Sequence, residues 1–176
     1  KPGITYTAAI FNPEGFERAD KYYPKINVRM RQYQTHIELS NTFAMRNYNR
    51  TQEQQITNMD SIIQRAKEDG GRYGGVVLGS PFGCNFEGEF TLQQRMRLLK
   101  LMIDRWHEHG LAVKRCTLGD AMGWNLPNEV KETLYAIREK WPEITEFHCH
   151  FHNTRGVAII TYYEALQLGV DHFDTC

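Results

Sequence analysis

The chain has 176 residues, and its 21 lysines and arginines balance its 21 aspartates and glutamates, so its formal charge is zero. Hydrophobic residues make up 41 % and charged residues 24 %, which is an ordinary globular composition. This composition excludes a disordered charged tail, a collagen-like repeat and a general nucleic-acid binder. The sequence contains no run of about 18 apolar residues, so we expect no membrane span.

The four cysteines are spread widely without a CxxC pair. This spacing favours reduced thiols over a disulfide framework or a zinc cluster, and we therefore expect a cytoplasmic protein. The chain begins Lys1-Pro2-Gly3, with neither an initiator methionine nor an apolar leader, so we expect no secretory signal and a piece of a longer chain. The cysteines are Cys84, Cys116, Cys149 and Cys176.

Short β-rich runs alternate with longer amphipathic segments at roughly 35-residue spacing, which predicts a parallel α/β sheet built from right-handed βα units. Such strands fit either an open doubly wound sheet or part of an eight-stranded barrel, and periodicity alone does not choose. The expected strands are Ile4–Ile10, His36–Ser40, Gly75–Gly79, Leu111–Leu118, Glu146–Phe151 and Val170–Asp174.

Sequence signals also mark the ends of the expected helices. Capping boxes open two of them, with TQEQ at 51–54 and TLQQ at 91–94, and Gly110 suits the end of the second. Pro127 suits the first turn of a third helix, and the last expected helix is Val157–Leu168. The sequence contains no linker, low-complexity segment or obvious domain boundary.

The segment HCHFHN at 148–153 carries the sharpest functional signal. On a strand, His148, His150 and His152 point to the same face. Imidazoles buried without partners are costly, and a divalent cation is a natural partner because neutral imidazole donates a ring nitrogen to it. We expect His150 and His152 at the functional rim and His148 one layer deeper. The alternative is a set of hydrogen-bonded core histidines, which we favour for His148.

Two other segments follow strands, where parallel α/β proteins place their ligands. GDAMG at 119–123 puts Asp120 in a loop that faces the histidine rim, where a carboxylate can orient a ligand or move a proton. An aspartate that caps the next helix is an equal alternative. SPFGCNFEG at 80–88 is by composition only a shaped loop. GGRYGG at 70–75 precedes a strand and lacks the Gly-Lys-Ser/Thr ending of a phosphate-binding loop, so it predicts a flexible connection between a helix and a strand.

Taken together, these motifs resemble those of the 3-hydroxy-3-methylglutaryl-CoA (HMG-CoA) lyase family, within the DRE-TIM metallolyases. The family has GDTxG after barrel strand six and HxH(D/N)TxG at strand seven, and this chain has GDAMG at 119–123 and HFHNTRG at 150–156. The family's FGCPYEG after strand five resembles FGCNFEG at 82–88, which favours the lyases over the isopropylmalate-synthase branch. NPEGFE at 12–17 and the segment 169–174 are similar to the family's segments at strands three and eight.

The resemblance implies that residues 1–176 form a single domain covering about strands three to eight, six of the eight, of a (β/α)8 TIM barrel. It would lack the N-terminal strands and the C-terminal segment of that domain. The family's Arg-Asp pair, its GLGGCP loop and its metal-binding Asn are absent from this sequence, and Cys176 comes too early to be the catalytic Cys.

The resemblance further implies a divalent-metal-dependent lyase that cleaves an HMG-CoA-like acyl-CoA to acetyl-CoA and a 3-oxo acid, as in leucine degradation. Mg²⁺ or Mn²⁺ would bind His150 and His152 together with the missing Asp and Asn, and Zn²⁺ suits that donor set less well. Asp120 and His150 are the implied catalytic residues. Thr117 and Asn49 are the implied substrate-binding residues.

Departures from the family pattern leave alternatives open. Ala121 replaces the usual Thr, Arg155 replaces a frequent Tyr, and the region 24–35 is longer, all of which point to a related acyl-CoA substrate. One alternative is a Claisen-condensing acyltransferase of the isopropylmalate or homocitrate synthase type. Another is an inactive truncated barrel that acts as a binding or structural module.

We expect an acyl-CoA as partner, no nucleic acid, no membrane, and a homodimer as in the family.

Overall fold

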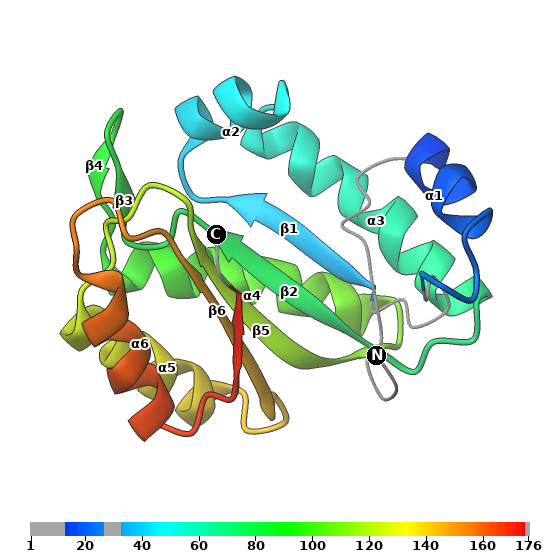
Figure 1. Ribbon diagram of the computed structural model, residues 1–176. Helices are drawn as coiled ribbons and strands as arrows, with labels where there is room; N and C mark the ends of the chain where they lie inside the picture. The colour runs from blue at the N-terminus through cyan, green and yellow to red at the C-terminus, as the bar shows by residue number, and fades with distance from the viewer. Residues whose placement is uncertain (1–12, 27–32, 175–176) are drawn as a thin grey trace. The chain divides into compact units, whose positions relative to one another are not determined.

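The computed structural model describes residues 13–26 and 33–174 (Figure 1). By its contacts the chain divides into two compact units, residues 1–32 and 33–176. The described part of the first unit contains helix α1 (Pro13–Asp20). The expected strand Ile4–Ile10 lies outside the described residues, and so does Cys176. Whether the two units fold as one domain stays a prediction.

The second unit is built on a five-stranded parallel sheet with the order β1-β2-β5-β6-β7. Each of these strands therefore pairs with the next one along the chain, apart from a small β3–β4 hairpin that forms its own sheet. A doubly wound sheet reverses its strand order at a switch point, and this sheet does not. The strands are β1 (Gln34–Glu38), β2 (Tyr73–Gly79), β3 (Gly83–Cys84), β4 (Gly88–Glu89), β5 (Ala112–Asp120), β6 (Glu146–Phe151) and β7 (His172–Asp174).

Helices connect the strands and pack along the outer side of the sheet (Figure 1). Both predicted capping boxes are present, at Thr51 and at Thr91, and Pro127 lies in the first turn of its helix. Gly110 follows α4, the second of the two helices with a capping box, and its φ of +77° is the left-handed conformation that suits a helix end. The helices are α2 (Asn41–Tyr48), α3 (Gln52–Glu68), α4 (Leu92–Glu108), α5 (Pro127–Lys140) and α6 (Ala158–Gln167).

The structure shifts several expected boundaries and adds elements. Strand β6 has its predicted bounds, whereas β5 continues two residues further than expected, to Asp120. Helix α2 and the β3–β4 hairpin were not predicted from the sequence. Among the described helices, none has both the length and the apolar character that a membrane crossing requires.

The two faces of the sheet differ in chemistry. The face toward the helices is apolar, and alternate strand residues on it join one buried core. The opposite face carries polar residues, which in a closed barrel would point to the interior. Core residues contributed by the strands include Ile37, Val76, Leu78, Cys116, Leu118, Phe147, Cys149 and Phe151.

Trp106 of α4 determines how closely this helix approaches β2. Its ring is fully buried, and its Nε1 donates a hydrogen bond to Thr35 Oγ1 at 3.0 Å. A Cβ on Gly74 would lie 2.1 Å from the ring, whereas a Cβ on Gly119 would meet nothing closer than 3.9 Å. We expect Gly74→Ala to lower the free energy of unfolding by about 3 kcal/mol and Gly119→Ala by far less. Urea unfolding of the two variants checks this, and equal midpoints would contradict it.

The described cysteines Cys84, Cys116 and Cys149 are free and buried. Burial raises the pKa of the Cys116 and Cys149 thiols to about 12. The folded state therefore holds these protons at a pH where the unfolded chain releases them, so stability falls as pH rises from about 9 toward 12. Each thiol contributes about 1.4 kcal/mol per pH unit in that window. Urea midpoints measured at several alkaline pH values should show this slope, and Cys149→Ala should reduce it.

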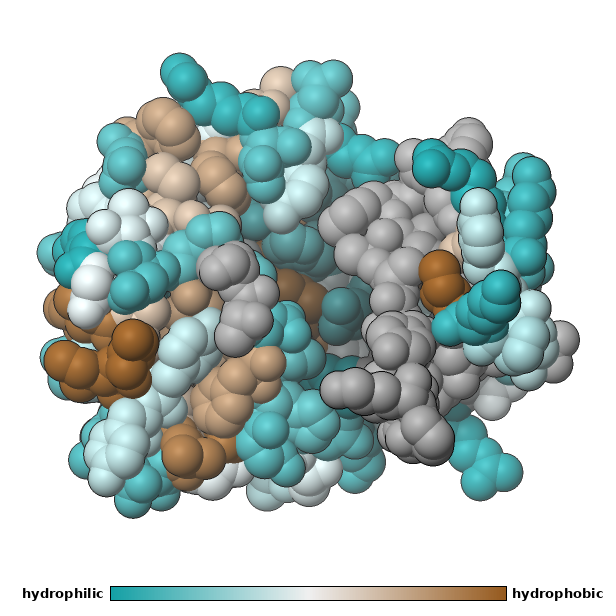
Figure 2. All heavy atoms as spheres, viewed as in Figure 1, coloured by the Kyte–Doolittle hydropathy of each residue, from teal (hydrophilic) through white to brown (hydrophobic). Residues whose placement is uncertain are grey.

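Apolar side chains are also exposed on the outer face of α6, where Figure 2 shows them gathered at the surface. Ile159 is 73 % exposed, and Ile160, Tyr163 and Leu166 are exposed beside it. A contiguous apolar stripe is typical of a surface that contacts another element or another chain. The homodimer nevertheless stays a prediction.

Candidate active site at the carboxyl edge of the sheet

Strand register arranges the polar face of the sheet in layers. Glycines occupy two positions of the layer at the carboxyl edge. The Glu38 carboxylate lies over Gly79, whereas a Cβ on Gly119 would meet nothing closer than 3.9 Å, so this layer is open above Gly119. The edge layer consists of Glu38, Gly79, Gly119, His150 and Asp174. The next layer consists of His36, Val77, Thr117, His148 and His172.

His150 and His152 converge at this edge, as the alternation of the strand predicts. Their Nε2 atoms lie 3.2 Å apart, and their ring centroids are 5.1 Å apart at an interplanar angle of 67°. Two nitrogens that bind one octahedral cation at right angles, with bonds of about 2.1 Å, lie about 3 Å apart. The same separation also suits a hydrogen bond between the two rings. The geometry of this imidazole pair therefore fits two neighbouring ligands of one ion.

Asp174, at the end of β7, contacts two of the histidines. Its Oδ2 lies 3.6 Å from His150 Nδ1, and its Oδ1 lies 3.3 Å from His148 Nε2. A carboxylate beside Nδ1 orients the ring and leaves Nε2 for a metal or a substrate. From the sequence, the segment 169–174 was expected only as a strand, and this contact was not predicted. The signal that could have revealed it is the pairing of β7 with β6, which puts Asp174 opposite His150.

His148 has the surroundings of an interior histidine. Its ring lies edge-on to His172, with centroids 5.4 Å apart, and it contacts Asp174. Burial lowers the pKa of His148; nearby Arg115 and His172 act in the same direction, and Asp174 opposes them. This supports the interpretation of His148 as a hydrogen-bonded histidine one layer below the rim.

Asp120 is the last residue of β5 and not a loop residue, because pairing with β6 extends to the 120–151 pair. The carboxylate is fully buried, and its Oδ2 accepts hydrogen bonds from Asn125 N at 2.6 Å and Asn125 Nδ2 at 2.7 Å. Its backbone oxygen accepts from His152 N at 3.1 Å. Oδ1 is buried without a hydrogen-bond partner. Asp120 pairs with Phe151 on the face of the sheet that carries the core, so the expectation that it faces the histidine rim is not met. No described contact joins the carboxylate to the imidazole pair, and Asp120 braces the loop with one oxygen lacking a partner.

The two implied substrate-binding residues lie in different surroundings. Thr117 shares the polar face and pairs in register with His148, and its buried Oγ1 lacks a hydrogen-bond partner. Asn49 is exposed, and it ends α2 in the left-handed conformation with φ 52° while its backbone N–H bonds to Met45 O. The structure thus places Thr117 on the face of the site, and Asn49 in a helix-capping position that asparagine tolerates well.

The FGCNFEG segment forms the β3–β4 hairpin, and Glu87 attaches it to the start of α2. Glu87 Oε1 accepts hydrogen bonds from Ser40 Oγ at 2.9 Å and from Thr42 N at 2.7 Å. Burial opposes ionisation of Glu87, but hydrogen bonds from Thr42 and Ser40 outweigh it and lower the pKa. Cys84 Sγ donates to Ser40 Oγ at 3.1 Å. This motif therefore fixes one loop of the rim against the next.

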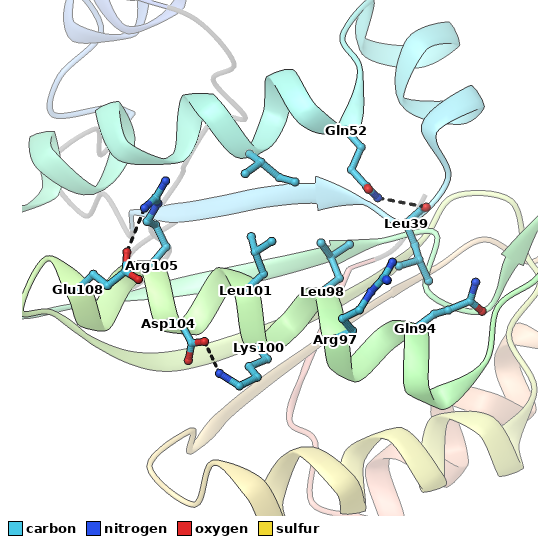
Figure 3. Close-up of a pocket in the computed structure, with 11 residues that line it drawn as sticks. Leu39, Gln52, Gln94, Arg97, Leu98, Lys100, Leu101, Asp104, Arg105 and Glu108 are labelled. Atoms are coloured by element: carbon cyan, nitrogen blue, oxygen red, sulfur yellow. Dashed lines mark hydrogen bonds and ion pairs between the residues drawn. The ribbon is translucent and has the colours of Figure 1, made fainter.

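A separate pocket of about 700 Å³ lies between α3 and α4, on the helix side of the sheet (Figure 3). Leu39, Ile56, Leu98 and Leu101 contribute its apolar part. Its charged side chains include the Lys100–Asp104 and Arg105–Glu108 pairs, which Figure 3 marks with dashed lines. The pocket lacks the histidines of the edge layer. The candidate active site is therefore on the opposite side of the sheet.

Within the residues that the structure describes, no three His, Cys, Asp or Glu side chains form a metal-binding group. The imidazole pair would thus be part of a larger ligand set. A singly wound parallel sheet with convergent side chains at its carboxyl edge is the arrangement of a (β/α)-barrel enzyme, here an incomplete barrel.

Comparison with known proteins identifies the family. Residues 6–176 match the family model HMGL-like, and the chain belongs to this family. It is 25 % identical to hydroxymethylglutaryl-CoA lyase YngG of Bacillus subtilis, over 98 % of this chain and 53 % of the relative. It is also 25 % identical to the (R)-citramalyl-CoA lyase of Chloroflexus aurantiacus, over 96 % of this chain and 49 % of the relative. The chain thus spans about half the length of these relatives.

Solved structures confirm the barrel class. The crystal structure of Bacillus subtilis HMG-CoA lyase matches with a TM-score of 0.72 and 27 % identity, over 99 % of this chain and 54 % of that one. An HMG-CoA lyase from Acinetobacter baumannii, in complex with coenzyme A and 3-methylmalate, matches in fold with a TM-score of 0.72 at 23 % identity. The prediction of an incomplete TIM barrel is confirmed.

Proposed function

We propose that this chain is the catalytic part of a carbon–carbon lyase that cleaves a 3-hydroxy acyl-CoA of the HMG-CoA type. The products would be acetyl-CoA and a 3-oxo acid. Family membership supports the class of reaction, and relatives named HMG-CoA lyase and (R)-citramalyl-CoA lyase support the class of substrate. The single observation that carries the proposal is the imidazole pair, with Nε2 atoms 3.2 Å apart at the carboxyl edge of the sheet.

His150 and His152 would hold a divalent cation, with further ligands from outside this sequence. When bound, Mg²⁺ or Mn²⁺ would polarise the substrate hydroxyl and make its proton easier to remove. The chain's own contribution is orientation, because the Asp174 carboxylate lies 3.6 Å from His150 Nδ1 and would favour a proton there, leaving Nε2 for the ion.

The remaining site residues would handle protons and hold the substrate. Asp120, with its free Oδ1, and His150 would assist removal of the hydroxyl proton. Thr117 would donate its unpartnered hydroxyl to the substrate from the floor of the site. Asn49 is the weaker candidate for substrate contact, given its capping position.

Removal of divalent ions tests the proposal. We expect the native-length polypeptide to cleave HMG-CoA or a related 3-hydroxy acyl-CoA, to lose at least about 10²-fold in rate after chelation, and to recover with Mg²⁺ or Mn²⁺ more fully than with Zn²⁺. Release of acetyl-CoA is the measurement. Full cleavage without any divalent ion would refute the metal dependence. Thiol release from acetyl-CoA and a 2-oxo acid, without cleavage, would instead establish the condensing alternative.

A further inference from the structure

His152 is held less directly than its neighbour in the imidazole pair. Strand β6 ends at Phe151, so His152 lies one residue beyond the last pair of the β5–β6 ladder. Within the part of the chain that the structure describes, the His152 ring hydrogen-bonds only to the His150 ring, whereas His150 also has the Asp174 carboxylate beside it. The position of the His152 ring therefore depends on how the backbone of its loop is fixed.

Arg155 joins the loop of His152 to the loop 121–126 between β5 and α5. Its Nε donates to Gly123 O at 2.9 Å, and its Nη2 donates to Trp124 O at 2.7 Å. Both donors belong to one planar guanidinium, so a single side chain holds two successive carbonyl groups. The guanidinium also lies over the Trp124 ring, 5.4 Å from its centroid. Arg155 thus fastens its own loop, three residues after His152, to its neighbour.

The two loops are in close contact where Arg155 joins them. Gly123 has φ +69°, and a Cβ there would lie 2.8 Å from the Thr154 side chain and 3.0 Å from His152 O. Glycine is therefore required both by the left-handed backbone and by the close approach. His152 N in turn donates to Asp120 O at 3.1 Å. A displacement of either loop would therefore reach the backbone of His152.

Trp124 extends this connection to a third loop. Its Nε1 donates to Asn85 Oδ1 at 2.8 Å on the β3–β4 hairpin, and a Cβ on Gly83 would lie 2.7 Å from its ring. Glu87 binds the hairpin to the start of α2. The loops that follow β1, β2, β5 and β6 are therefore linked in series, and Arg155 is the side chain that includes the loop of His152.

We propose that Arg155 is a positioning residue for the divalent ion, because it holds His152 at the separation from His150 that one ion requires. This inference rests on the proposed function. The Nε2 atoms are 3.2 Å apart, and ligands of a functional site must be held to within about 0.5 Å of their productive positions. Asp174 lies beside the His150 ring, and Arg155 acts on the other ring through the backbone.

The charge of Arg155 opposes this role, which makes the two contributions separable. A positive side chain near the site repels a divalent ion, so removal of the charge alone would strengthen ion binding. Loss of the two carbonyl bonds would instead weaken ion binding, by about 10- to 100-fold for groups that orient a metal ligand. The direction of the change in affinity therefore shows which contribution dominates.

The test measures Mn²⁺ binding by electron paramagnetic resonance in the native-length protein. Arg155→Gln and Arg155→Lys should both bind Mn²⁺ about 10-fold more weakly, because lysine keeps the charge but lacks the paired donors. Arg138→Gln is the matched control. Arg138 lies on α5 with its guanidinium 4.8 Å from the centroid of the Phe147 ring, so this variant also loses a stacked arginine, but on the helix side of the sheet. It should bind as the unchanged protein does.

Two further measurements distinguish positioning from general damage to the fold. Nitrogen modulation of the electron spin echo of bound Mn²⁺ reports coordinated imidazole, and we expect the contribution of one ring to weaken in Arg155→Gln. At saturating Mn²⁺, kcat of this variant should largely recover while KM stays unchanged. A lower melting temperature alone would produce neither result.

Unchanged or tighter Mn²⁺ binding in the Arg155 variants, with the nitrogen modulation of two imidazoles preserved, would overturn the inference and leave the lyase proposal intact. Should Arg155→Gln fail to fold, Arg155→Lys decides, because it keeps a positive side chain at the Trp124 ring. If the unchanged protein neither binds Mn²⁺ nor cleaves an acyl-CoA, the proposed function itself is wrong, and this inference is wrong with it.

Discussion

Replacing His152 with alanine should reduce acyl-CoA cleavage by at least about 10³-fold and should weaken divalent-ion binding in parallel, because one of two convergent ring nitrogens is lost. The Nε2 atoms of the imidazole pair are 3.2 Å apart, so removal of either ring leaves a single donor at this edge. Binding of Mn²⁺, followed by electron paramagnetic resonance, measures the loss independently of activity.

His107→Ala is the matched control for this variant. His107 lies on α4, on the helix side of the sheet, and its side chain is 45 % exposed. We expect the control to bind Mn²⁺ and to turn over at nearly the original rate. If His152→Ala keeps its Mn²⁺ affinity, the two rings merely hydrogen-bond to each other and the metal proposal is wrong.

Periodicity predicted the elements that have a long apolar face. Strand β6 alternates strictly between buried and half-buried residues, and its bounds were predicted correctly. Helix α2 was missed because only Phe43 and Ala44 are buried in its eight residues, and it is stabilised by an N-cap in which Ser40 Oγ accepts from Phe43 N. The strands of the β3–β4 hairpin have two residues each, too few for any alternation. Short elements held by specific hydrogen bonds leave little pattern in the sequence.

The choice between a barrel and a doubly wound sheet could not be read from the sequence for a related reason. Both have the same alternation of strands and helices, and they differ only in which strands are neighbours. Strand order is a property of the whole sheet, and it appears once β1, β2, β5, β6 and β7 are seen to pair consecutively.

The candidate site was predictable only where its residues lie on one strand. His150 and His152 are two positions apart, so alternation places them together. Asp174 and Glu38 reach the site face from other strands, and their positions depend on the register with β6 and β2. A histidine pair within one strand is therefore visible in the sequence, whereas a carboxylate that orients one of its rings is visible only in the structure.

Asp120 presents two functions that a pair of variants can separate. Its Oδ2 braces Asn125, whereas its Oδ1 is buried and free. An unpaired buried oxygen is costly, and a substrate hydroxyl would satisfy it. We expect Asp120→Asn to lower kcat about 10²-fold or more, because an amide cannot take up the hydroxyl proton.

Asn125→Ala is the companion variant, because it removes one of the two bonds to Oδ2 and leaves the Asp120 carboxylate in place. We expect it to lower the melting temperature while kcat and its pH profile change little, the reverse of Asp120→Asn. The measurements are kcat against pH and thermal unfolding on both proteins. If the two variants lose stability and activity together in the same proportion, Asp120 only braces the loop, and removal of the hydroxyl proton must be assigned to another group.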